Sequence, residues 1–170
     1  MLELNDIQHI LLTRTPALTG QYEFVSFRDR GGGKAWVTAL LDKVQSAAEA
    51  GSSVASSKRW VTLAFTWNGL RTLGVDEGSL ATFPEEFKQG MVARAEMLGD
   101  TGVNHPDNWV GGLASPDLHA IAILFARDAG ERERFVKKVK EDQGIDFEIG
   151  DMHVEIAAAL ALVLEGAGKR

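Results

Sequence analysis

The pattern of hydrophobic and polar positions divides this chain into short β segments joined by helical ones. Residues 21–27, 60–66, 118–126 and 147–156 are rich in branched or aromatic side chains and predict four strands. The third of these segments is apolar at both parities, which is typical of a strand covered on both faces. Between the strands, apolar residues recur every three or four positions, as in amphipathic helices.

The connections predict the helices. A first helix has its apolar stripe over residues 36–48 and ends at Gly51. The three glycines before it, in the segment RDRGGGK, predict a flexible turn, because a phosphate-binding loop would need a different glycine spacing and a following hydroxyl. Asp128 is the expected N-cap of a second helix, and residues 156–164 predict a last one.

The connection between the second and third strands is unusually long and predicts a helical insertion over about residues 67–116. A short helix should close at Gly74, and one long amphipathic helix should run from its cap at Thr82 to Gly99. The remainder is rich in glycine and proline and predicts an irregular surface segment.

The order strand, helix, strand, insertion, strand, helix, strand indicates an α+β protein. We expect the ferredoxin-like βαββαβ topology, with a four-stranded antiparallel sheet and helices on one face. A chain of 170 residues with 45% hydrophobic content supports one core, so we expect a single domain over residues 1–170.

Two helices can cover only one face of such a sheet, yet the strands predict two apolar faces. On the second strand one face carries Val61, Leu63 and Phe65 and the other Trp60, Thr62 and Ala64. On the third strand one face carries Leu118, Ala120, Ala122 and Leu124 and the other His119, Ile121, Ile123 and Phe125. A wet apolar face of this size is uncommon in monomers, so we expect a second sheet, from another domain or another copy of the chain. The isolated chain should therefore self-associate or be poorly soluble.

Several stretches resemble the N-terminal half of the dye-decolorising (DyP-type) haem peroxidases, from about Asp6 to about Arg127. They read DIQHILLTRTP, FTWNGLRTLGV, FPEEFKQGMVARAEMLGDTG, and NWVGG followed by DLHAIAILFA. The resemblance implies two ferredoxin-like halves packed sheet against sheet, a haem cofactor, and peroxide-dependent oxidation of bulky organic substrates.

The haem-site motifs of that family are not visible in this chain. The family's G-x-x-D-G motif, peroxide-side arginine and proximal histidine follow its first half, whereas Gly74 to Gly78 reads G-V-D-E-G, with Asp76 one place too early. We assign no catalytic residue, and we expect no peroxidase activity without the missing half. The alternative is a haem-free structural or small-ligand-binding module that dimerises like a dimeric α+β barrel.

Histidines are the candidate cofactor ligands, because a haem ligand must face a cavity. His119 could point between two sheets and is the candidate, with a packed histidine as the alternative. His153 lies near Asp151 and Glu155, which could bind a metal, but an exposed polar strand face explains the trio more simply, and no metal site is assigned. The four histidines are His9, His105, His119 and His153.

The tryptophans suggest electron relay or substrate stacking in a peroxidase. Trp36 and Trp60 lie at core spacing and are interpreted as packing residues, while Trp67 and Trp109 should anchor the insertion.

Charge and composition exclude several classes. With 18 basic and 24 acidic residues the net charge is -6, which disfavours nucleic acid as a partner. The absence of cysteine excludes disulfides and thiolate metal sites and fits a reducing compartment. The N-terminus does not resemble a signal peptide, and the longest apolar run is far shorter than the roughly 20 residues of a membrane span. We expect a cytoplasmic protein.

Overall fold

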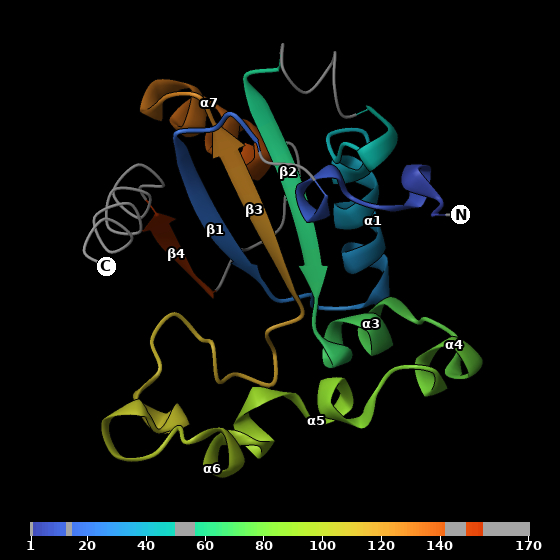
Figure 1. The fold of residues 1–170 in the computed structure, drawn as a ribbon, viewed down its shortest axis with the longest axis vertical. Coiled ribbons are helices and arrows are strands. Elements are labelled where there is room, and N and C mark those ends of the chain that lie inside the picture. The colour runs from blue at the N-terminus through green and yellow to red at the C-terminus, as the bar shows by residue number, and fades with distance from the viewer. Residues whose placement is uncertain (1, 13–14, 50–56, 142–148, 155–170) are drawn as a thin grey trace, which may run out of the picture.

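An antiparallel sheet forms the centre of the computed structural model, which describes residues 2–12, 15–49, 57–141 and 149–154 (Figure 1). Its strands are β1 (Thr19–Val25), β2 (Arg59–Phe65), β3 (Ala120–Ala126) and β4 (Ile149–Val154). β3 pairs with both β1 and β2, and β4 lies beside β1, giving the order β2-β3-β1-β4. The α+β class and the antiparallel sheet are confirmed, and the predicted last helix over residues 156–164 lies outside the described residues.

One face of the sheet is covered by α1 (Arg30–Leu41) and α7 (Ala129–Glu141). Trp36 and Leu40 of α1 and Phe135 and Val139 of α7 are all at most 4% exposed. They pack on strand residues of one parity, which are Val25, Val61, Leu63, Ala120, Ala122 and Leu124. We call this the helix-covered face, and it holds the main hydrophobic core.

Both helices begin at aspartate caps. Asp29 accepts a 2.8 Å hydrogen bond from the backbone N–H of Gly32, so the three glycines form the first turn of α1 and not a turn before it. Asp128 caps α7 in the predicted way, accepting from the N–H of Glu131 at 2.8 Å.

The predicted continuation of the first helix to Ala48 is wrong, because α1 ends at Leu41. Val44 instead forms an isolated parallel bridge to Val61 of β2, and Ala47 lies in a short 3₁₀ turn. A long-range backbone contact with the sheet therefore replaces the last helical turn.

The helical insertion lies at one end of the sheet (Figure 1). It contains α3 (Trp67–Leu73), α4 (Glu77–Ala81), α5 (Glu85–Ala93), α6 (Ala95–Leu98) and two 3₁₀ turns, Gly102–Asn104 and Pro106–Asn108. The short helix closed by Gly74 is confirmed, since Gly74 adopts the left-handed conformation at φ 74°.

The single long helix predicted from Thr82 to Gly99 is wrong. Gly90 has φ 73° and ψ 178°, a conformation open to glycine alone, and the chain bends there and again at Arg94. Thr82 ends α4 instead of capping the next helix, and α5 starts after Pro84 without a side-chain cap. The segment therefore forms two short helices, α5 and α6, that follow a curved path instead of one straight helix.

The second face of the sheet is covered only in part. Trp60 is fully buried against Ala17 and Phe125, and the Arg127 guanidinium lies 6.0 Å from the centre of its ring. Further along, Ile121 and Ile123 of β3 remain partly exposed, whereas their neighbours on the helix-covered face are buried. The predicted second apolar face is therefore present. It is closed at Trp60 and at Phe24, which lies opposite Ile121 and is 2% exposed, and it is partly open at Ile121 and Ile123.

The free edge of β2 is occupied by a side chain from the N-terminal segment. Gln8 donates from Nε2 to the carbonyl of Leu63 at 2.8 Å and accepts from the N–H of Leu63 through Oε1 at 2.9 Å. This amide pairs with the strand as a neighbouring backbone would. Within the described ranges no helix is long and apolar enough to cross a membrane.

Candidate functional site

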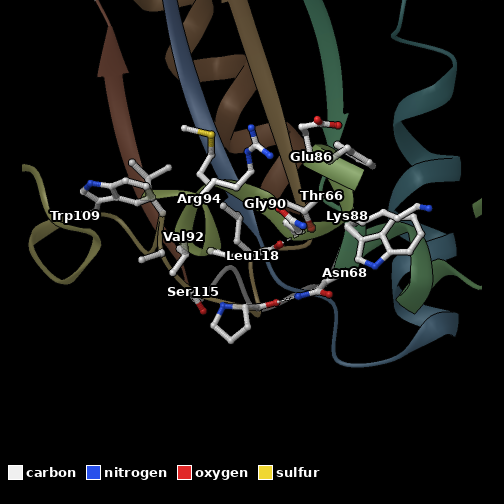
Figure 2. Close-up of a pocket in the computed structure, with 18 of the residues that line it drawn as sticks. Thr66, Asn68, Glu86, Lys88, Gly90, Val92, Arg94, Trp109, Ser115 and Leu118 are labelled. Atoms are coloured by element: carbon white, nitrogen blue, oxygen red, sulfur yellow. Dashed lines mark hydrogen bonds between the residues drawn. The ribbon is translucent and has the colours of Figure 1, made fainter. Parts of the chain in front are cut away.

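A groove of about 1090 Å³ lies between the helical insertion and the end of the sheet (Figure 2). Leu118 and Ile121 contribute to it from the start of β3, and Phe65 from the end of β2. Met91 and Leu113 add apolar walls from the insertion, although each is more than a third exposed. The site therefore depends on the bend at Gly90, which curves α5 and α6 around the strand ends.

Aromatic rings close one end of the groove. Trp67 stands edge-on to Phe83 and Phe87, each with ring centroids 6.3 Å away, and the two phenylalanine rings are 5.0 Å apart. Lys88 Nζ lies 5.9 Å from the centre of the Trp67 ring. This cluster fixes α3 against α5.

Hydrogen bonds to backbone carbonyls hold the walls at both ends of the groove. Trp109 donates from its indole nitrogen to Asn104 O at 2.9 Å, and Asn68 Nδ2 donates to Pro116 O at 3.0 Å. Thr66 Oγ1 donates to Leu118 O at 2.7 Å and also caps α3. The interpretation of Trp67 and Trp109 as anchors of the insertion is supported, and Trp36 and Trp60 are buried as packing residues.

Three charged side chains line the groove, namely Glu86, Lys88 and Arg94. Lys88 has a carboxylate nearby, with Glu85 at 4.0 Å, and donates to Ala81 O at 3.3 Å. Arg94 is partly buried at the junction of α5 and α6, and its contact is the thioether sulfur of Met97 at 3.5 Å. No carboxylate of the described residues pairs with it.

His119 lies in the packing between the sheet and α3, outside the groove. Its Nδ1 accepts from the N–H of Phe27 at 2.8 Å, its ring stacks on the Phe27 ring at 5.4 Å, and its Nε2 is 3.5 Å from Thr72 Oγ1. Burial lowers the pKa of His119, opposed by the nearby Asp117 carboxylate. Both ring nitrogens thus face protein groups.

The other described histidines are also outside the groove. His9 is fully buried in the N-terminal segment, and burial lowers its pKa. His105 is half exposed and accepts from Asp107 N, in the predicted surface loop. The backbone of β4 places Asp151 opposite Glu23 and His153 opposite Gln21, while Glu155 lies outside the described residues. Among the side chains that the structure describes, no three metal-ligating groups come together.

Residues 34–158 match the family model described as the DyP dimeric α+β barrel domain. The chain belongs to the DyP-type peroxidase family. Its similarity is to the N-terminal part of these proteins, as the resemblance of the sequence motifs implied. No curated protein matches the chain.

Solved DyP structures share the fold. A dye-decolorizing peroxidase in complex with 2,6-dimethoxyphenol is 21% identical with a TM-score of 0.73, and the match covers 91% of this chain and 34% of that one. The decolorizing peroxidase from Auricularia auricula-judae is 18% identical with a TM-score of 0.75, at the same coverages. The chain therefore spans about a third of the length of the DyP structures it matches.

The described residues do not fit a haem as the DyP family would need it. A haem requires an axial ligand directed into a cavity, yet none of the described histidines lines the groove, and the nitrogens of His119 face Phe27 and Thr72. Asp76, in the G-V-D-E-G stretch, caps α4 by accepting from Ser79 N at 3.0 Å and Ser79 Oγ at 2.7 Å. These bonds lower the pKa of Asp76, so its role here is structural.

Proposed function

We propose that this chain is the N-terminal portion of a DyP-type haem peroxidase and is inactive alone. In this proposal it is a single ferredoxin-like βαββαβ domain whose second face receives a second α+β half. The observation that carries the proposal is the partly exposed apolar face around Ile121 and Ile123, in a chain that matches only 34% of the related structures.

The geometry of the sheet favours a structural role for this chain, as the packing surface for the second half, over a catalytic role. Buried Ala120, Ala122 and Leu124 fix the sheet on its helix-covered face, so Ile121, Ile123 and Phe125 are held in place on the other face. A sheet packed on them at about 10 Å would remove their remaining exposed surface from water. Haem, when bound by the complete enzyme, supplies the peroxide-dependent oxidation of bulky organic substrates. His119 is a positioning residue for α3 in this scheme.

Haemin titration of the purified chain tests the proposal. We expect no sharp Soret band and no peroxide-dependent bleaching of an anthraquinone dye, because the described part of the chain presents no axial ligand to a cavity. The Soret band and the dye bleaching are then measured again after adding the C-terminal portion of a DyP-type peroxidase and compared with those of the chain alone. A stoichiometric Soret band together with dye bleaching by this chain alone would overturn the proposal.

The partly open face also predicts association between copies of the isolated chain. Light scattering coupled to size exclusion should show a dimer or larger species, and Ile123→Asp should shift it to monomer. The exposed Val103→Asp serves as the control, since Val103 is 87% exposed on the insertion. A clean monomer at high concentration contradicts this expectation.

The second candidate is a haem-free module that dimerises through the same face, favoured by the family's description as a dimeric α+β barrel. A discrete, soluble dimer that neither binds haemin nor gains activity with a C-terminal portion would favour it.

A further inference from the structure

We propose that residues 2–12 form a pH-sensitive strap, which covers the outer edge of β2 while His9 is neutral and is released when His9 gains a proton. We call these residues the N-terminal strap. Its release opens the backbone N–H and C=O of Leu63 for pairing with another strand. This device goes beyond the function proposed above and involves neither haem nor a second half.

Hydrogen bonds fasten the middle of the strap. Gln8 donates from Nε2 to Leu63 O at 2.8 Å and accepts from Leu63 N at 2.9 Å. The His9 N–H donates to Gln45 O at 2.9 Å, and the Ala47 N–H donates to Ile7 O at 2.7 Å. Figure 1 shows the strap, in dark blue, beside β2. The strap is therefore attached at residues 7–9, and Gln8 is its link to the sheet edge.

The strap buries little of its surface apart from His9. Within residues 2–12 His9 alone is fully buried, while Ile7, Gln8 and Ile10 are partly buried. The strap leucines are each at least 42% exposed, namely Leu2, Leu4, Leu11 and Leu12. Apolar burial therefore adds little to docking outside residues 7–10. A segment with so few buried contacts opens at a lower free energy than the core of the sheet.

The surroundings of the His9 ring disfavour its charged form. Burial lowers the pKa of His9 and outweighs the backbone of Gln45 and the carboxylate of Glu49, which both favour the proton. Ser46 fixes that carboxylate, donating to it from the backbone N–H at 2.8 Å and from Oγ at 3.2 Å. Protonation therefore favours the released strap, in which water hydrates the imidazolium.

Glu49 is the charged group that acts on His9 from the turn packed against it. Glu3 and Asp6 of the strap are exposed, and Lys43 Nζ donates to a backbone carbonyl of α1 at 2.6 Å. Residues 60–65 of β2 carry no charge. Among the described groups around the strap, His9 is therefore the one whose charge changes near pH 6.

The direction of the response follows from the two states of His9. The released strap has the ordinary histidine pKa of about 6.5, and the docked strap has a lower one. The strap is therefore fully docked above about pH 6.5 and loosens as the pH falls toward the docked pKa. Between pH 7.5 and 5.5 the ratio of released to docked chains should rise several-fold, with a ceiling of about tenfold set by the released pKa.

Amide hydrogen exchange of the purified chain, followed by NMR, tests the proposal. The measured quantity is the protection factor, which is the exchange rate of an unfolded chain divided by the measured rate at the same pH. Protection of the Leu63 N–H should fall several-fold from pH 7.5 to 5.5, because Gln8 is its acceptor. The Ala64 N–H faces the inner edge of β2 by the alternation of antiparallel pairs and should be better protected at both pH values.

One variant and one control isolate the role of His9. His9→Leu keeps an apolar side chain in the buried position, so the protection of the Leu63 N–H should stay high and no longer change with pH. His105→Gln is the matched control, since His105 is exposed on the insertion, and should leave the fall unchanged. NMR titration of the His9 ring in the unmodified chain needs no substitution. The ring should titrate over the range in which Leu63 loses protection, and this measurement decides if the substituted strap does not dock.

Three results would overturn the proposal. The first is constant protection of the Leu63 N–H from pH 7.5 to 5.5 in the unmodified chain, and the second is the same fall in His9→Leu. The third is equal protection of the Leu63 and Ala64 N–H groups, which would mean that the strap opens only with global unfolding. None of these measurements involves haemin, so failure of this proposal and failure of the proposed function are recognised separately.

Discussion

The two faces of the central sheet have different side chains and different surroundings. On β3, Ala120, Ala122 and Leu124 are buried beneath α1 and α7, while Ile121 and Ile123 between them keep part of their surface in water. On β3 the larger side chains therefore point away from the main hydrophobic core beneath α1 and α7. Burial stabilises in proportion to the area removed from water, so stability should come mainly from one face and association from the other.

Truncation on each face should separate these roles and gives the largest expected effect. Leu124→Ala removes a fully buried side chain from the core and should lower the free energy of unfolding by about 2–5 kcal/mol. Ile123→Ala, one residue away on the open face, should cost only about 1 kcal/mol. Urea unfolding at low protein concentration measures both. Equal losses would mean that the chain covers both faces equally.

The contact between α3 and the sheet is the next most sensitive. A Cβ at Gly69 would overlap the carbonyl of His119, so Gly69→Ala must push α3 off β3 and should cost about 2 kcal/mol. Gly130→Ala is the matched control, because a Cβ there meets Asp128 Oδ1 at an ordinary 3.4 Å. Thermal unfolding of the two variants compares them, and a stable Gly69→Ala protein would contradict the close packing.

His119 should make the stability depend on pH. Burial lowers its pKa in the folded chain below the unfolded value of about 6.5, so the unfolded state binds the proton more readily. The stabilisation is therefore complete above about pH 6.5 and is lost as the pH falls toward the folded pKa. Chemical unfolding from pH 7.5 to 5.5 should show this loss.

Replacing His119 sharpens that result. His119→Phe keeps a ring on Phe27 but leaves the Phe27 N–H without its acceptor, which should cost about 1–3 kcal/mol near neutral pH. The loss of stability on acidification should then shrink to the part due to His9, whose pKa burial also lowers. An unchanged pH profile would contradict this assignment.

The smallest expected effect concerns the start of α1. Asp29→Ala removes the side chain that accepts from Gly32 N and should cost about 1 kcal/mol. Asp42→Ala, at the other end of the helix, removes an acidic residue from the negative end of the helix dipole and should be neutral or slightly stabilising. Thermal unfolding distinguishes the two, and equal destabilisation would argue against the cap.

Sequence patterns over a few residues correctly predicted the strands and the helix cap that depend on neighbouring residues alone. The alternation in residues 60–66 and the apolar run 118–126 located β2 and β3 within two residues, and Asp128 predicted the start of α7. The parity of Ile121 and Ile123 correctly indicated a second apolar face. These features follow from side-chain periodicity and capping, both of which can be read over a few residues.

The errors arose where the backbone or a distant contact decided the structure. The apolar spacing from Phe87 to Leu98 fits one helix, but the backbone of Gly90 bends the chain. Val44 has helical spacing yet pairs with Val61 of β2. The groove was not predicted at all, because residues from Phe65 to Ile121 form it only after the insertion folds back on the sheet.

Gln8 bears on how copies of this protein can aggregate. Its amide already satisfies both backbone groups of Leu63 on the outer rim of β2, so an incoming strand finds no free pairing site at that position. Lateral extension into a cross-β fibril is thereby disfavoured at this rim. Variants that lose this amide, such as Gln8→Leu, would leave the N–H and C=O of Leu63 open to an incoming strand and should form fibrils more readily.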